Sequence, residues 1–206
     1  MQIDVIFQII ILIFSIMIHE ISHGSVALFF GDKTALYEGR LTLNPLKHID
    51  WFGSVFLPIF LVLIKAGFII GWAKPVPYNP YNLKNRQVAE PLISLAGPVS
   101  NLLVATIFGM VIRGLLYFGF SNSPLISIFG YVVMINVALA LFNLIPIPPL
   151  DGSKIFFSFL PADLKFKFFE FADRYGLILL IVLVTLLPGI VTPAIQFVFS
   201  LLTGIK

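Results

Sequence analysis

Two histidines and a glutamate inside a long apolar run are the residues best suited to chemistry. They belong to the segment HEISH, residues 19–23, within the apolar run 5–30. On a helix, residues four apart share a face, so the two imidazoles point the same way. In this HExxH pattern two imidazoles hold zinc and the carboxylate takes a proton from water. The spacing therefore predicts His19 and His23 as metal ligands and Glu20 as a general base.

The surroundings of this cluster argue against a chance match. The run is long enough to cross a bilayer as a helix. Ionisable side chains at the centre of such a helix cost about 2.5–3.5 kcal/mol each on insertion scales. A bound metal would offset that cost, whereas the alternative is a metal-free polar cluster packed between helices. The run lacks a basic flank and a clear cleavage site, so we expect a retained helix rather than a signal peptide.

The composition indicates an integral membrane protein. Of 206 residues, 59% are hydrophobic and 11% are charged, whereas about a quarter are charged in soluble domains. Long unbroken apolar runs favour helices over a barrel. The chain has no cysteine, which leaves His, Asp and Glu as the strong metal ligands. The net charge of +3 is interpreted as loop charge that sets orientation, so no nucleic-acid partner is expected.

Three apolar segments are expected to cross the membrane, at residues 5–30, about 91–120 and 125–144. Together they predict an all-α polytopic membrane protein. Its core would be three transmembrane helices, joined by a re-entrant and extended segment and followed by a C-terminal hydrophobic helix or hairpin. We expect a single domain over 1–206, with the catalytic core at about 5–155.

The remaining segments are less regular. Residues 51–71 contain Pro58, Lys65 and Gly67 and are expected to dip into the membrane and return. Prolines in the next stretch predict an extended segment at 71–77.

Two segments follow the third span. Residues 154–174 alternate charges with phenylalanines, which is typical of an interfacial helix or a peripheral packing helix. The C-terminal hydrophobic region, 176–203, is interrupted by Pro188 and Pro193. Each half is too short to span alone, so it forms either one kinked crossing or a hairpin.

A catalytic zinc needs a third protein ligand. A histidine six residues after His23 would supply it in one known pattern, but that position is Phe29. The candidates are Asp151, Glu38, Asp50, Glu90 and His48. Asp151 is favoured because three prolines at 146–149 must unwind the chain just before it. The alternative is that Asp151 caps the following helix, and His48 is expected to be a surface histidine.

Basic residues predict the orientation of the chain. They concentrate in segments 32–50, 72–90 and 154–174, which the positive-inside rule places in the cytoplasm. The unwound chain before Asp151 then ends on the cytoplasmic side at a depth similar to His23, so the topology brings Asp151 to the same side as the histidines.

Three motifs in this order resemble the site-2 protease family of intramembrane zinc metalloproteases. They are HEISHG at 19–24, GPVSN at 97–101 and NLIPIPPLDG at 143–152, so the resemblance covers most of the chain. The segments RLTLNP at 40–45 and GWAKPVP at 71–77 resemble a compact bacterial subgroup. No stretch is long enough for the PDZ or CBS domain that many relatives carry.

The resemblance implies one zinc ion per chain, bound by His19, His23 and Asp151, with Glu20 as general base. It also implies that Asn143, the motif asparagine, helps to hold the oxyanion. No organic cofactor is expected. The implied activity is hydrolysis of peptide bonds in or near transmembrane helices, as in regulated intramembrane proteolysis.

The extended segment suggests how substrate is held. An unwound substrate could pair with it as an added strand, which makes Gly71, Trp72, Lys74 and Val76 candidate substrate-binding residues. The partners implied are the membrane and single-span proteins, such as anti-sigma factors or signal-peptide remnants. The expected location is a bacterial cytoplasmic membrane, with the site open to the cytoplasm.

Two other functions use the same residues. A metal transporter would use His19, His23 and Asp151 as a passing site, but transporters usually show repeats or a path of polar residues. The sequence has no internal repeat. A catalytically inactive binding or chaperone protein is the second alternative, and the complete polar set argues against it.

Overall fold

A computed structural model describes residues 5–64, 73–161 and 188–205, with 163, 164, 167, 168, 170, 171, 174–176 and 179. In chain order the helices are α1 (Val5–Phe29), α2 (Thr34–Tyr37), η1 (Pro45–Lys47), η2 (Trp51–Phe56), α3 (Leu57–Leu63), η3 (Pro80–Asn82), α4 (Arg86–Tyr117), α5 (Pro124–Asn143), α6 (Asp151–Ser158) and α8 (Pro188–Thr203). No strand occurs within these described ranges.

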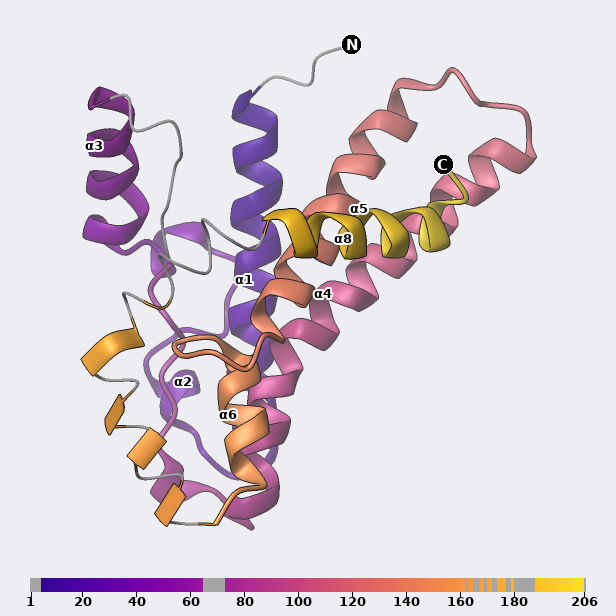
Figure 1. The fold of residues 1–206 in the computed structure, drawn as a ribbon. Coiled ribbons are helices and arrows are strands. Elements are labelled where there is room, and N and C mark those ends of the chain that lie inside the picture. The colour runs from indigo at the N-terminus through magenta and orange to yellow at the C-terminus, as the bar shows by residue number, and fades with distance from the viewer. Residues whose placement is uncertain are drawn as a thin grey trace.

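In the part of the chain that the structure describes, three helices are long and apolar enough to cross a membrane, as predicted: α1, α4 and α5. They lie side by side in Figure 1, with the loops after α1, the start of α4 and helix α6 gathered at one end. Helix α4 begins at Arg86, before the predicted start at Pro91. Arg86 donates to Glu90 one turn later at 2.7 Å, and such a pair stabilises a first turn.

Helix α4 is the centre of the packing and contacts α1, α5, α6 and α8. Between α4 and α5 a buried apolar cluster is formed by Ala105, Ile112, Val133 and Val137. Small residues bring membrane helices close to one another, and α4 uses this principle twice. Gly109 lies against α8, and Gly97 lies against the histidines of α1.

Helix α8 lies across α4 and α5 (Figure 1). It continues through Pro193. Arg113 of α4 donates to the last carbonyls of α8, from Nη2 to Leu201 at 2.6 Å and from Nε to Leu202 at 2.8 Å. Arg113 therefore caps this helix. The choice between one kinked crossing and a hairpin depends on residues 180–187, which lie outside the described chain.

The predicted re-entrant segment is described in its first half. The π-helix η2 continues directly into α3, so the chain stays helical through Pro58. Figure 1 shows α3 standing apart from the three long helices. Lys65, Gly67, Gly71 and Trp72 lie outside the described residues.

The polar loop after α1 has a buried interior. Asp32, Arg40 and His48 expose 0%, 5% and 3% of their surface. The expectation of a surface histidine at His48 was therefore wrong. Its Nε2 donates to the carbonyl of Thr42 at 2.8 Å, so His48 is a buried structural residue rather than a surface one.

Candidate metal centre

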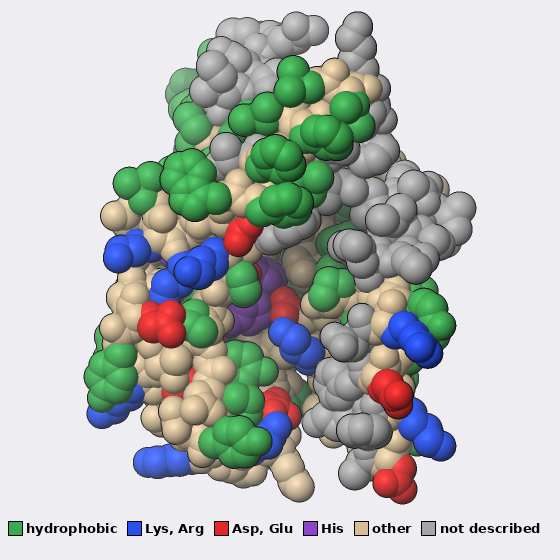
Figure 2. Space-filling model, turned by 90° about the vertical axis from the view of Figure 1, so that its left-hand side faces the viewer, with side chains coloured by type: hydrophobic (Ala, Val, Ile, Leu, Met, Phe, Trp, Pro, Cys, Tyr) green, Lys and Arg blue, Asp and Glu red, His purple; other side chains and the backbone are tan. Residues whose placement is uncertain are grey.

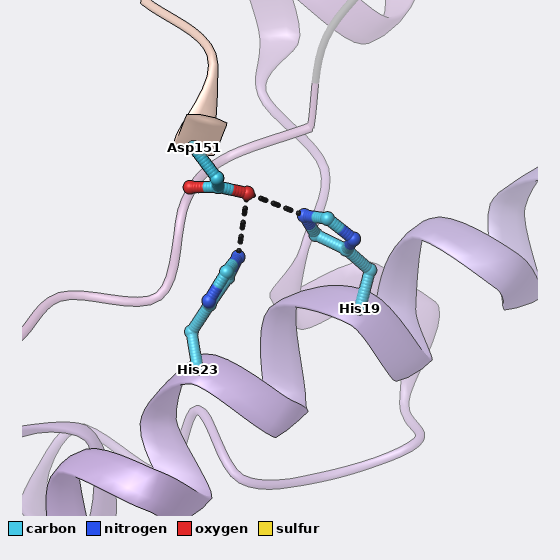
Figure 3. A group of neighbouring side chains, drawn as sticks. All are labelled: His19, His23 and Asp151. Atoms are coloured by element: carbon cyan, nitrogen blue, oxygen red, sulfur yellow. Dashed lines mark hydrogen bonds and ion pairs between the residues drawn. The ribbon is translucent and has the colours of Figure 1, made fainter. Parts of the chain in front are cut away.

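Three side chains from distant parts of the chain converge on one point. Helix α1 presents His19 and His23 on one face, and the unwound chain after α5 delivers Asp151 at the start of α6 (Figure 3). Asp151 Oδ2 lies 3.0 Å from Nε2 of His19 and 3.1 Å from Nε2 of His23. All three residues are buried.

The structure distinguishes among the candidate third ligands. Among the described residues, the group whose ligand atoms lie within 4.8 Å of one another consists of His19, His23 and Asp151. The other four candidates, Glu38, Asp50, Glu90 and His48, do not join it. Asp151 is the first residue of α6, yet its carboxylate faces the histidines, and the alternative of a helix cap is not what the contacts show.

A chain of hydrogen bonds places the proton of His19 on Nδ1, the ring nitrogen that does not face Asp151. Asn136 on α5 donates to the carbonyl of Val132 at 2.9 Å, so its Oδ1 accepts from Asn101 Nδ2 at 2.8 Å. Asn101 must then present Oδ1 to His19 Nδ1, 2.7 Å away. Nδ1 therefore carries the proton, and the lone pair of the neutral ring is on Nε2.

His23 is oriented in the same way. Its Nδ1 donates to the main-chain carbonyl of Ile93 on α4 at 2.6 Å. A carbonyl can only accept, so the Nε2 lone pair of the neutral His23 ring also points toward Asp151. Such outer hydrogen bonds are typical of histidines that bind metals.

The candidate metal centre therefore brings nitrogen lone pairs and a carboxylate together, and a bound cation would neutralise their negative charge. An aspartate ordinarily carries its negative charge at neutral pH, so a carboxylate oxygen and two nitrogen lone pairs face the same point. Zinc bonds of about 2.0–2.1 Å in a tetrahedron place ligand atoms about 3.3 Å apart. The observed spacing fits that ion.

Close approach of the elements depends on two glycines. A Cβ at Gly97 would lie 2.6 Å from Nε2 of both His19 and His23. A Cβ at Gly152 would collide with the main-chain carbonyls of Leu144 and Ile145 in the unwound chain. Both glycines belong to the sequence motifs, and each lets one backbone approach the candidate metal centre.

Glu20 points toward the extended segment. Its Oε2 accepts a hydrogen bond from the main-chain N–H of Val76 at 2.8 Å. Val76 is buried, and both residues line the same cavity as the histidines. The sequence placed Val76 in a segment for substrate, but the contact with Glu20 was not predicted.

A cavity of about 180 Å³ opens at the candidate metal centre. Figure 2 shows histidine at the floor of a hollow on this face, with acidic and basic side chains near it. The residues lining it are His19, Glu20, His23, Pro75, Val76, Tyr78, Ile93, Ser94, Asn143, Pro149, Asp151 and Lys154.

The structure also shows where the other predicted site residues lie relative to the cavity. Asn143 lines the cavity and donates one N–H to the carbonyl of Leu139 at 2.9 Å. Lys74 is exposed and does not line the cavity. Sequence reasoning missed Tyr78 and Ser94. Ser94 could have been found, because Pro98 removes the N–H that the Ser94 carbonyl would accept in a helix.

The sequence matches one known protein family over part of its length. Residues 118–183, a segment that includes Asn143 and Asp151, match Peptidase family M50. No solved structure matches.

Three relatives carry the name putative zinc metalloprotease. YwhC of Bacillus subtilis is 41% identical over 182 residues, which is 86% of this chain and 79% of YwhC. Rip2 of Mycolicibacterium smegmatis is 28% identical over 88% of this chain and 65% of its own length. MJ0611 of Methanocaldococcus jannaschii is 33% identical over 66% of this chain and 62% of its own length.

An all-helical membrane protein with a buried His-His-Asp group has the fold and donor set of a membrane metalloenzyme. The extent of the similarity to YwhC defines it further. The chain belongs to peptidase family M50, the site-2 protease family, and is a zinc metalloprotease.

Proposed function

We propose that this metalloprotease is an intramembrane endopeptidase whose zinc is held by His19, His23 and Asp151. The observation that carries the proposal is the convergence of these three side chains between membrane-spanning helices, with Glu20 lining the same cavity. Zinc bound there would lower the pKa of water and polarise the scissile carbonyl.

The protein's own groups would manage the protons. Glu20 takes a proton from the attacking water and returns it to the amine nitrogen that leaves. Asn143 commits one of its two N–H groups to Leu139, so the second remains to donate to the oxyanion that develops on the substrate. Burial raises the pKa of Tyr78, and the charge of Glu90 adds to this, so its phenol stays neutral beside the cavity.

The substrate class follows from where the cavity lies. A peptide bond must reach a buried centre that membrane-spanning helices hold, which favours single-span proteins whose helix unwinds locally. Unwound backbone at that depth is tolerated where it lines a wet cavity, and this one has charged residues at its lining. We propose that water and the unwound substrate reach it from the cytoplasmic side, where the basic loops would lie.

The test is cleavage by detergent-purified protein of a library of single-span membrane proteins, with Glu20→Gln as the matched control. Cleavage fragments present with the native protein and absent with Glu20→Gln would support the proposal. Equal metal uptake into vesicles by both forms, without cleavage, would instead support a metal transporter.

A further inference from the structure

We propose that Arg40 is a positioning residue for catalysis, because it fixes the main-chain N–H of Val76 against the carboxylate of Glu20. The inference rests on the proposed role of Glu20 as general base. In this account the loop 73–76 orients the base, and Arg40 is the group that holds the loop in place.

Val76 is the one donor available at this point of the chain. Pro75 and Pro77 flank it and have no N–H. The Val76 N–H donates to Glu20 Oε2 at 2.8 Å. Within the described part of the chain no other hydrogen bond to Glu20 is seen, and Glu20 also lines the cavity at the candidate metal centre.

The guanidinium of Arg40 ties this loop to the preceding one. Nη2 donates to the carbonyl of Lys74 at 2.6 Å and to that of Pro75 at 2.9 Å. Nη1 donates to the carbonyl of Lys47. Arg40 is buried, so these contacts are made away from water, and three carbonyls on two loops share one rigid planar group.

A second anchor fixes the far side of the same loop. Asp32 accepts from the main-chain N–H of Asn79 at 2.7 Å and from the side chain of Asn82 at 2.9 Å. Val76 thus lies between two buried, charged anchors. A loop held on both sides keeps its N–H in one position, which is what orientation of a catalytic base requires.

A glycine on helix α1 also leaves space for the loop that carries Val76. A Cβ at Gly24, the residue after His23, would lie 2.7 Å from Cγ1 of Val76 and 2.7 Å from Cδ2 of Leu41. The glycine that ends HEISHG therefore leaves the space that the loop occupies beside Glu20.

The first test measures the loop without any substrate. Hydrogen exchange of residues 73–83, followed by mass spectrometry, is compared in the native protein, Arg40→Lys and Lys33→Ala. Lys33 is an exposed cation of the same loop and serves as the control. Faster exchange in Arg40→Lys alone supports the proposal, and unchanged exchange in Arg40→Lys overturns it.

The second test measures kcat and KM on a single-span protein cleaved in a Glu20-dependent manner, with zinc content as the check on folding. Val76→Pro removes the N–H, whereas Val76→Ala removes only the side chain. We expect Val76→Pro and Arg40→Lys to keep zinc and lower kcat about 10–100-fold, while Val76→Ala raises KM and keeps most of kcat.

The outcomes separate the two proposals. Equal loss of kcat in Val76→Pro and Val76→Ala, or a pure KM effect in Arg40→Lys, contradicts the positioning role. If the native protein cleaves none of the substrates, the proposed function fails, and hydrogen exchange still decides whether Arg40 holds the loop.

Discussion

Asn101 Oδ1 lies 2.7 Å from His19 Nδ1, so a residue of α4 sets the proton position of a candidate metal ligand on α1. Asn101 is itself fully buried and fixed by Asn136. The position of the proton on the His19 ring is therefore set through Asn101 by Asn136, which lies on a third helix, α5.

This relationship predicts the effect of removing the amide. Asn101→Leu keeps the branched shape of the side chain but leaves His19 Nδ1 without an acceptor. We expect zinc affinity to fall about 10–100-fold, as for other outer-shell partners of metal-binding histidines. Competition with a chelator measures it. Thr106→Val on the same helix is the control, because among the described residues Thr106 bonds to its own helix carbonyl at Leu102, and an equal loss there would argue against the tautomer explanation.

Gly97 gives a steric prediction. The methyl group of Gly97→Ala would overlap Nε2 of both histidines. The rings are held by Asn101 and the Ile93 carbonyl and cannot both turn away. We expect loss of zinc from purified protein that still forms its helices, measured by elemental analysis and circular dichroism.

Gly114→Ala is the matched control for this steric effect. Gly114 lies on the same helix, and no neighbouring atom of the described residues lies within 4 Å of its Cβ position. Zinc retained in Gly97→Ala at the level of Gly114→Ala would show that α4 does not press on the ligands.

Lys154 should matter little to metal affinity. Its Nζ lies 3.7 Å from Asp151 Oδ1, and its side chain is 44% exposed. Exposed ion pairs contribute about 0.2–1 kcal/mol, which is less than about five-fold in affinity. Chelator competition with Lys154→Ala checks this, and a loss as large as that of Asn101→Leu would mean that Lys154 has a direct role in holding the ligand.

The hydrogen bonds to Asp32 predict that the stability of the folded protein depends on pH. Burial alone would raise the pKa of Asp32, but hydrogen bonds from Thr34, Asn82 and Asn79 lower it below its ordinary value. A lowered pKa in the folded state means that the carboxylate stabilises the fold above about pH 4. That contribution is lost as the pH falls through the folded-state pKa.

Thermal unfolding of Asp32→Asn between pH 3 and pH 7 tests this. We expect the variant to be less stable near neutral pH by about 1–3 kcal/mol, with the difference shrinking toward acid. Glu38→Gln, an exposed acid of the same loop, should follow the native curve. A difference for Asp32→Asn that stays constant or grows toward acid would contradict the assigned hydrogen bonds.

The convergence of the three candidate ligands could be predicted from sequence because its causes are local. Helical spacing places His19 and His23 on one face, and prolines 146, 148 and 149 end α5 and free the chain before Asp151. The structure confirms the unwinding and shows the carboxylate facing both rings. The lengths of the apolar segments likewise predicted three spanning helices.

The loops could not be predicted in the same way. His48 was interpreted as a surface histidine, because polar residues in a loop are usually exposed, and the burial of Arg40 and Asp32 was not predicted. Arg40 and Asp32 pair with main-chain groups of a neighbouring loop that turn inward and need partners, whereas His48 pairs with the Thr42 carbonyl of its own loop. The pairings of Arg40 and Asp32 join residues 34 and 47 positions apart in the sequence, and no periodicity records them. The prolines around Val76 were a usable signal, since they leave a single donor to be positioned.

The claim on which the account depends is that His19, His23 and Asp151 share one zinc ion. X-ray absorption at the zinc edge of purified native protein measures it directly. We predict about one zinc per chain, with two imidazole nitrogens and oxygen ligands at about 2.0–2.2 Å, and loss of that signal in Asp151→Ala. Folded, proteolytically active protein without zinc, or an unchanged zinc shell in Asp151→Ala, would contradict it.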